Sequence, residues 1–137
     1  AAFMKSQKVF KRHINELQSI FSFLKGNWNE FEVEEGVQME MQLSVEELFM
    51  NMVRHNSDAE GDIKMNVERK GDKINISLID SEEVPFDLTK IKEVDFDQYF
   101  EEKKFGGLGI HLVKELMDEI KFNHCNGIST ITMTKQI

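Results

Sequence analysis

Three side chains able to do acid–base or metal chemistry recur at one-turn spacing in the middle of the chain. Glu47, Asn51 and His55 stand four positions apart, so a helix would carry all three on one side. Asparagine is a poor residue for a helix interior, and a carboxylate four residues before an amide suits a metal ion held by phosphates. By itself this motif favours a solvated polar face, and a functional metal–phosphate face is the alternative that gains weight only together with the other motifs.

Glycines gather immediately before a strongly apolar segment near residue 108. Gly106, Gly107 and Gly109 surround Leu108. Glycines at the start of a helix let the backbone approach a phosphate, which the free N–H groups and the helix dipole stabilise. The spacing is neither the Gly-x-Gly-x-x-Gly dinucleotide pattern nor the P-loop with its Gly-Lys-Ser or Gly-Lys-Thr end. It predicts an anion site of another kind, with a plain loop end as the alternative.

A third candidate is the aspartate that closes an alternating apolar segment. Asp80 follows Ile74, Ile76 and Leu78 at every second position. An aspartate where a strand ends can accept a hydrogen bond from a ligand amine. An ordinary turn aspartate explains the same position, so Asp80 gains weight only together with the other two motifs.

The elements that must position these residues follow from the periodicity of the apolar residues. Helical spacing predicts helices, and alternation bounded by turn residues predicts β-hairpins. Gly36 is expected to break the first helical pattern, and the turns are expected at Gly71 and at Asn126-Gly127. The predicted helices cover residues 15–31, 37–56 and 108–120, and the predicted strands cover residues 62–69, 73–80, 120–125 and 128–135.

Single residues of these elements carry expectations of their own. Asn15 is expected to cap the first helix, with Ile14 on its apolar stripe. Leu112 is expected on the buried side of the last helix, and Cys125 as a packed strand residue rather than a nucleophile. A polar stretch over residues 87–105 exceeds an ordinary connection, and loops of that length are usually functional.

The order of the elements predicts the fold class. Helix, helix, hairpin, long loop, helix and hairpin form a segregated pattern, without the alternation of strands and helices that gives a parallel sheet. We therefore expect an α+β two-layer sandwich, in which a mixed, mainly antiparallel sheet carries its helices on one face.

Composition narrows the class of function. The 137 residues carry a formal net charge of −8, which argues against nucleic acid as a partner, because phosphate backbones are bound by clustered Lys and Arg. No apolar run approaches the length of a membrane span, and a lone cysteine suits a reducing cytoplasm. Residues 1–3, ahead of Met4, are typical of a tag remnant. A single domain is therefore expected over residues 4–137, in a cytoplasmic protein.

Taken in order, the three motifs resemble a known family. The segment Val45–His55 looks like the N box of GHKL (histidine-kinase-like) ATPases, in the form found in anti-sigma factor serine/threonine kinases. Residues 80–87 resemble the G1 box, and residues 106–112 together with Met117-Asp118 resemble the G2 box. The resemblance extends over about residues 8–135 and implies the GHKL ATPase fold.

The resemblance implies a role for each candidate residue. The family's counterpart of Glu47 is the general base acting on a serine or threonine hydroxyl, and that of Asp80 binds the adenine amine. The counterpart of Asn51 binds Mg²⁺ on the nucleotide phosphates, and residues 87–105 correspond to the ATP lid. The residues implied in binding the nucleotide are Asn51, His55, Asp80, Gly106, Gly107, Leu108 and Gly109.

We therefore expect a bacterial, ATP- and Mg²⁺-dependent serine/threonine-protein kinase that regulates an anti-sigma factor partner-switching system. The implied partners are an antagonist protein of the STAS type and a sigma factor, and the family commonly forms homodimers. The G1 box departs from the family pattern, because Ser81 is followed by Glu82 and Glu83 where a glycine is usual. This departure supports the alternative of a non-catalytic binding module. A sensor histidine kinase fits less well, since His13 lies too near the start to be its phosphoacceptor.

Overall fold

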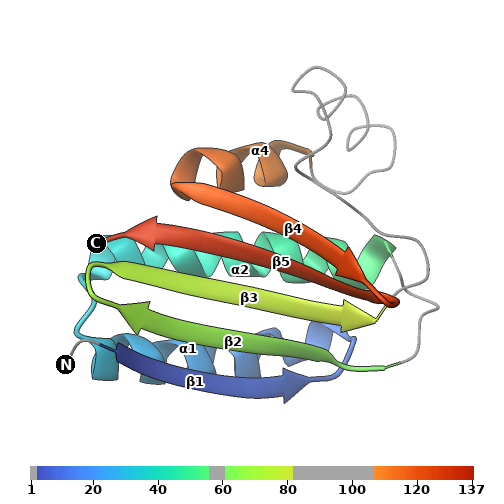
Figure 1. Cartoon of the computed structure of the whole chain (residues 1–137), viewed down its shortest axis with the longest axis horizontal. Coiled ribbons are helices and arrows are strands. Elements are labelled where there is room, and N and C mark those ends of the chain that lie inside the picture. Colours follow the sequence, from blue (N-terminus) through green and yellow to red (C-terminus); the bar gives the residue numbers. More distant parts are fainter. Residues whose placement is uncertain (1–2, 56–60, 82–106) are drawn as a thin grey trace.

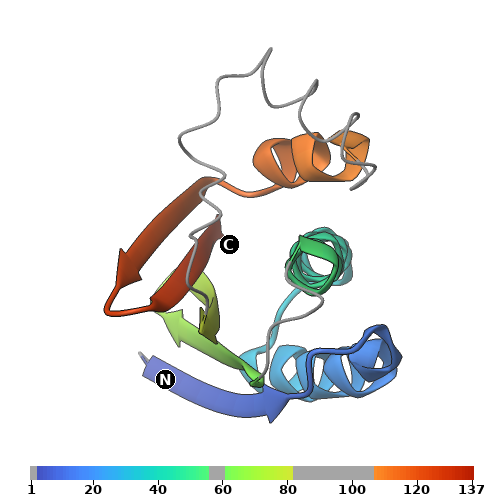
Figure 2. The same cartoon turned by 90° about the vertical axis from the view of Figure 1, so that its right-hand side faces the viewer.

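The computed structural model describes residues 3–55, 61–81 and 107–137. These residues form two layers, in which three α-helices lie on one face of a five-stranded sheet (Figure 1 and Figure 2). Every strand pair within the described part is antiparallel. The expected α+β two-layer sandwich is confirmed, and its sheet is wholly antiparallel over the described residues rather than mixed. No helix in this part of the chain is both long enough and apolar enough to cross a membrane.

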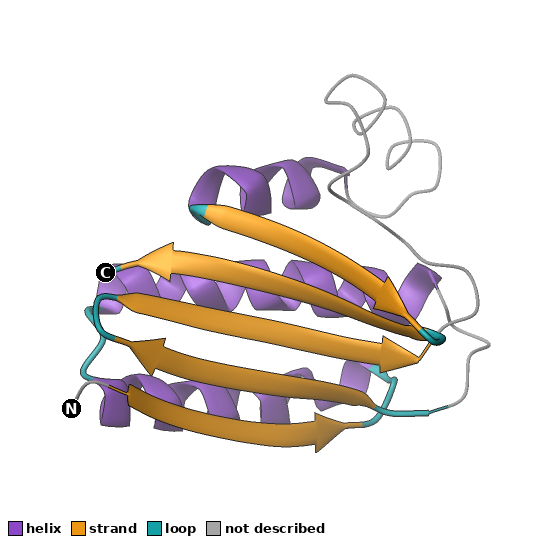
Figure 3. Ribbon diagram, viewed as in Figure 1, coloured by secondary structure: helices purple, strands orange, loops and turns teal. Residues whose placement is uncertain are grey.

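The sheet has the strand order β1-β2-β3-β5-β4 and faces the viewer in Figure 3. Its strands are β1 (Phe3–Phe10), β2 (Ile63–Lys70), β3 (Lys73–Ser81), β4 (Glu119–Cys125) and β5 (Ile128–Gln136). Behind it lie η1 (Ile14–Glu16, a 3-10 helix), α1 (Leu17–Phe31), α2 (Glu35–His55) and α4 (Gly107–Leu116).

The core lies between the sheet and the helices. Alternate residues of the central strands point toward the helices because side chains of a strand alternate between its two faces. The helices answer with stripes of large apolar side chains, so burial of apolar surface holds the two layers together. Fully buried members of this core include Ile63, Met65, Val67, Ile74, Ile76, Leu78, Met133, Leu24, Trp28, Phe31, Met41, Val45 and Phe49.

Both predicted hairpin turns are confirmed. Asn126 and Gly127 have φ angles of 52° and 76°, as a two-residue turn with both central residues left-handed requires. Gly71 has a φ of 62° between β2 and β3, a conformation that glycine adopts without steric cost.

The start of the chain differs from the sequence expectation. Strand β1 is absent from the predicted elements, because Ser6 and Lys8 occupy positions opposite the buried Val67 and Met65 and so hide its alternation. The first helical turn is capped by His13, whose Nδ1 accepts from the backbone N of Asn15 at 3.0 Å. Asn15 is therefore not the cap. Ile14 is 41% exposed rather than part of the core.

The break between α1 and α2 lies at Glu32 instead of Gly36. Glu32 adopts a left-handed conformation with φ 57°, and its N–H bonds the carbonyl of Trp28. Arg69 also donates to the carbonyl of Phe31, which satisfies an acceptor left open at the helix end. Gly36 lies inside the first turn of α2.

The last helix is shorter than predicted. The backbone N of Asp118 bonds Thr134 O at 3.0 Å, and its Oδ2 accepts from Gln136 N at 2.6 Å. These bonds lead the chain from the end of α4 at Leu116 into β4, which begins at Glu119. Leu112 is 42% exposed, contrary to expectation. Cys125 is exposed rather than packed.

Candidate nucleotide-binding site

Asn51 has one bonded and one unbonded polar atom inside the fold. Its Nδ2 donates to Glu47 O at 2.7 Å, one turn back along α2. Its Oδ1 is buried and has no hydrogen-bond partner among the residues that the structure describes, and the residue is only 1% exposed. The expectation that Asn51 lies on a solvated face is therefore wrong. A buried acceptor without a partner is costly, so this oxygen is available to a cation or a donor.

Glu47 supplies the acidic group of the same helix face. The carboxyl is partly buried one turn before Asn51. Burial raises the pKa of Glu47 above its ordinary value of 4.5; the charge of Glu46 adds to the increase and Arg54 opposes it. A carboxylate with a raised pKa is a stronger base, which suits proton abstraction near neutral pH.

The N-terminus of α4 comes level with Asn51. Lys135 donates both to Leu116 O at 2.5 Å and to Glu40 Oε2 at 3.3 Å, so the end of α4 lies beside the first half of α2. The two helices run in opposite directions (Figure 1). Ten residues of α4 rise about 15 Å, and the step from Glu40 to Asn51 rises about 16 Å. The free N–H groups of α4 therefore point toward the Asn51 end of α2, as an anion site requires.

Asp80 lies on the inner face of the sheet, in an ion pair. It is the last described inward-facing residue of β3 and is 2% exposed. Arg12, from the link between β1 and η1, donates Nη1 to Oδ2 at 2.9 Å and Nη2 to Oδ1. Arg12 carries no local signal in the sequence, because its partner stands 68 positions away.

Two more polar residues continue the row that Asp80 begins. Ser129 pairs with Asp80 across β3 and β5, and His124 pairs with Ser129 across β4 and β5. The His124 Nδ1 and Ser129 Oγ share a hydrogen bond of 2.8 Å. Neither residue was expected in the site, although the alternation of the last strand places Ser129 on the buried side with Ile131 and Met133. The C-terminal ends of α2 and β3 lie at this same end of the molecule, on the right in Figure 1.

Other predicted residues are placed only by their backbone or lie outside the described part. His55 is the last residue of α2, and Gly107, Leu108 and Gly109 form the first turn of α4. Gly106 and the expected lid at residues 87–105 lie outside the described residues.

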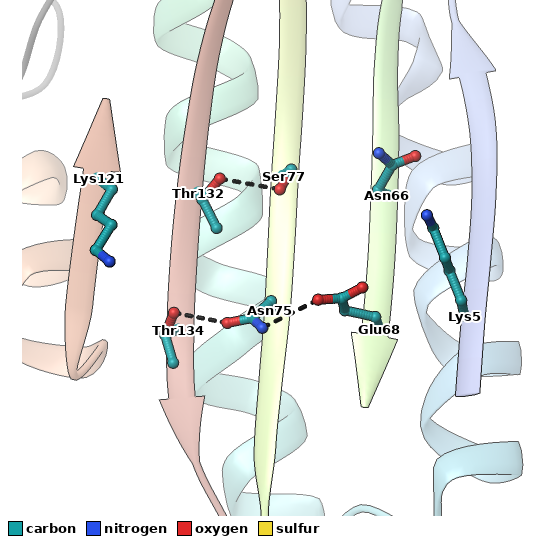
Figure 4. A pocket seen from close by; sticks show the side chains of 8 residues that line it. All are labelled: Lys5, Asn66, Glu68, Asn75, Ser77, Lys121, Thr132 and Thr134. Carbon is teal, nitrogen blue, oxygen red and sulfur yellow. Dashed lines mark hydrogen bonds between the residues drawn. The ribbon is translucent and has the colours of Figure 1, made fainter. Parts of the chain in front are cut away.

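A hollow of about 350 Å³ lies on the opposite, helix-free face of the sheet. Ser77 and Thr132 share a hydrogen bond of 3.0 Å, and Asn75 is bonded to both Thr134 and Glu68 (Figure 4). Its polar groups largely bond one another, and none of the predicted residues lines it. The inner-face residues therefore remain the better candidate site.

Comparison with known proteins decides the family. Residues 11–135 match the model of the histidine kinase-like ATPase domain. The chain belongs to this family. The resemblance to GHKL ATPases drawn from the three motifs is thereby confirmed, and the use of ATP follows from it.

Curated relatives of this histidine kinase-like ATPase domain are named serine-protein kinase RsbW. The proteins of Listeria monocytogenes EGD-e and Oceanobacillus iheyensis are 33% and 34% identical over 104 residues, which cover 72% of this chain and 65% of theirs. That of Staphylococcus aureus JH9 is 30% identical over 127 residues, which cover 88% and 75%. The chain thus spans somewhat less than two thirds of the Listeria and Oceanobacillus relatives.

Solved structures agree with the fold. The RsbU and RsbW domains of a Mycobacterium tuberculosis protein match with a TM-score of 0.68 and 17% identity, covering 97% of this chain and 32% of that one. The SiaB–SiaC complex of Pseudomonas aeruginosa matches with a TM-score of 0.59 and 13% identity, covering 99% and 90%. At these identities the likeness concerns the fold alone.

Proposed function

We propose that this chain is an ATP-dependent serine/threonine-protein kinase that regulates an anti-sigma factor partner-switching system. The observation that carries the proposal is the pair of Glu47 and Asn51 on α2. One turn of helix holds a carboxylate of raised pKa and a buried amide oxygen without a partner. The first is suited to take a proton, and the second to hold a cation on the phosphates.

The proposed reaction moves the γ-phosphoryl group of ATP to a hydroxyl of a partner protein. The hydroxyl oxygen bonds the phosphorus, its proton passes to Glu47, and the bond to the β-phosphate oxygen breaks to release ADP. Asn51 Oδ1 would hold Mg²⁺, which neutralises charge on the phosphates when bound. The first turn of α4 would orient the phosphates through its N–H groups. Positioning and charge neutralisation of this kind make up most of phosphoryl-transfer catalysis.

The partners are proposed from the relatives' names and from the motif resemblance. RsbW relatives are serine-protein kinases, which supports a serine or threonine as acceptor. A complex of SiaB with SiaC supports a protein partner for this fold, and we propose an antagonist of the STAS type. A sigma factor as second partner, a homodimer and a cytoplasmic location belong to the same proposal. The net charge of −8 suits a partner with a basic docking face.

The test is phosphoryl transfer by Glu47→Gln, with the partner obtained by pull-down or from a neighbouring gene. Glutamine keeps the shape and the helix propensity, so ATP affinity is expected to stay within a few-fold. Transfer from γ-labelled ATP is expected to fall about a hundredfold or more, because acid–base assistance is lost. Glu46→Gln removes the same charge one residue away and is expected to keep most of the transfer. Wild-type levels of transfer by Glu47→Gln would refute the role of Glu47.

A second candidate is a binding module that changes partners without phosphorylating them. The Arg12–Asp80 ion pair favours it, because the aspartate implied in adenine binding is already engaged within the chain. This candidate predicts that the wild-type chain binds its partner but transfers no phosphate to it. Labelled partner after incubation with Mg·ATP excludes it.

A further inference from the structure

The nucleobase end of the candidate site, at Asp80, is occupied by side chains of the chain itself. Arg12 engages both carboxylate oxygens of Asp80, one at 2.9 Å from Nη1 to Oδ2. The two side chains are 4% and 1% exposed. Such a fork-to-fork pair is among the strongest hydrogen-bonded arrangements of a carboxylate.

The backbone around Arg12 is fixed for this contact. His13 N bonds Lys11 O at 2.8 Å, and Lys11 N bonds Glu16 Oε1 at 2.9 Å. These bonds hold the turn between β1 and η1, from which Arg12 reaches β3. The ion pair is therefore a fixed tertiary contact between two elements, and Arg12 is not a mobile surface side chain.

The two ends of the site differ in how many of their polar groups already have hydrogen-bond partners. At the nucleobase end Asp80 is bonded to Arg12, and the neighbouring Ser129 is bonded to His124. At the phosphate end Asn51 Oδ1 is buried without a partner in the described part of the chain. A ligand gains most from groups left unsatisfied in the free protein, so recognition is expected to come from the phosphate end.

Because the Asp80 side chain is only 1% exposed and Arg12 bonds both of its oxygens, an incoming amine must compete with Arg12 for it. Separating a buried ion pair leaves a charge unpaired and costs more than one hydrogen bond from a neutral amine returns. We propose that Arg12 is a specificity-determining residue, which withholds Asp80 from the purine 6-amino group and makes the chain bind purine triphosphates with little regard to that group. This inference rests on the proposed function, since it assumes that the site binds a nucleotide.

The test compares two nucleotides that differ only at the amine. Calorimetry on the wild-type chain measures the Kd of Mg·ATP and of Mg·purine ribonucleoside 5′-triphosphate, which lacks the 6-amino group. The two values are expected to agree within about threefold. Tighter binding of ATP by tenfold or more, about 1.4 kcal/mol, would overturn the inference while leaving the nucleotide site intact. Failure of both nucleotides to bind would overturn the proposed function together with the inference.

Arg12→Met supplies the converse measurement. Methionine keeps an unbranched stem but frees Asp80, so ATP is expected to bind at least tenfold better relative to the amine-free nucleotide than it does in the wild type. Lys135→Met, which removes another largely buried cation with a carboxylate partner, is the matched control and should leave the ratio unchanged. An unchanged ratio in folded Arg12→Met refutes the role of Arg12. If that variant does not fold, the wild-type comparison alone decides.

Discussion

At the scale of single residues, Glu47 shows how the fold shapes a group for chemistry. It stands on α2 where part of its surface is removed from water, beside the like charge of Glu46 and the opposite charge of Arg54. Desolvation is the largest of these influences and raises its pKa. The same rise in pKa that makes the carboxylate a better base also means that its charged form destabilises the folded state.

The raised pKa predicts a pH-dependent difference in stability between wild type and Glu47→Gln. A carboxyl with a higher pKa in the folded state binds its proton more tightly there than in the unfolded chain. Wild-type stability therefore loses this contribution as the pH rises from about 4.5 through the raised value. The glutamine variant is expected to gain stability relative to wild type over that interval and to keep the gain at pH 7. Urea denaturation between pH 4.5 and 7.5, followed by the fluorescence of the single tryptophan, Trp28, measures the difference.

Glu47→Gln also removes one negative charge from a chain of net charge −8. The effect of that charge on stability has to be separated from the effect of the raised pKa. Glu30→Gln, at an exposed position of α1, removes an equal charge and serves as the reference. A difference between Glu47→Gln and wild type that stays constant with pH, or that shrinks as the pH rises, contradicts the assigned environment of Glu47.

The site could be predicted as far as local spacing reaches. Glu47 and Asn51 follow from the helical period. The period does not show that Asn51 is buried, because the flank of α2 that carries it is covered only in the tertiary fold. Arg12 and Ser129 meet Asp80 only through the tertiary fold and carry no local signal. Residues brought together across the sheet are therefore missed, and residues on one helix are found.

At the scale of elements, β2, β3 and both hairpin turns follow from local sequence patterns, whereas β1 and the end of α4 do not. The inward-facing positions of β2 from Ile63 to Val67 and of β3 from Ile74 to Leu78 are all apolar and buried. Both turns carry the residues that their backbone requires. Strand β1 carries the polar residues Ser6 and Lys8 at inward-facing positions, and only Phe10 at its end is fully buried in the core. The end of α4 depends on hydrogen bonds to β5 that no local sequence pattern predicts.

Lys135 links three elements and predicts a measurable loss of stability when removed. Its Nζ bonds the carbonyl of Leu116 at the end of α4 and the carboxylate of Glu40 on α2, from a side chain of β5 that is 13% exposed. Lys135→Met leaves a helix-end carbonyl without its donor, a loss of about 1–3 kcal/mol. Urea denaturation monitored through Trp28 gives the free energy of unfolding.

Lys121→Met is the matched control for this change. Lys121 also pairs with a glutamate, Glu119 at 3.3 Å, but both side chains are largely exposed. Exposed ion pairs contribute little, so its free energy of unfolding is expected to change by less than about 0.5 kcal/mol. Equal losses in the two variants would show that Lys135 does not fasten α4.

At the scale of the whole molecule, the candidate site joins both layers at one end. The helical layer contributes Glu47, Asn51 and the first turn of α4, and the sheet contributes Asp80 and Ser129. A nucleotide bound there would contact both layers at once. Ligand binding therefore adds to the free energy that keeps the layers together, and global unfolding reports on the site.

This linkage predicts that Mg·ATP stabilises the entire domain and that Asn51 carries the magnesium-dependent part. At a concentration one hundred times its Kd, a ligand specific to the folded state adds about 2.7 kcal/mol. Mg²⁺ alone is expected to add little, because Asn51 is a single neutral ligand for it. In Asn51→Ala, Mg·ATP is expected to stabilise no more than ATP with a chelator. Asn27→Ala is the matched control, since Asn27 is a buried helical asparagine that also bonds the carbonyl four residues back, at 2.9 Å from Phe23 O. Both variants lose basal stability, but only Asn27→Ala should keep the full response to Mg·ATP. A full response in folded Asn51→Ala would remove Asn51 from the metal site and leave its unbonded oxygen without the role assigned to it.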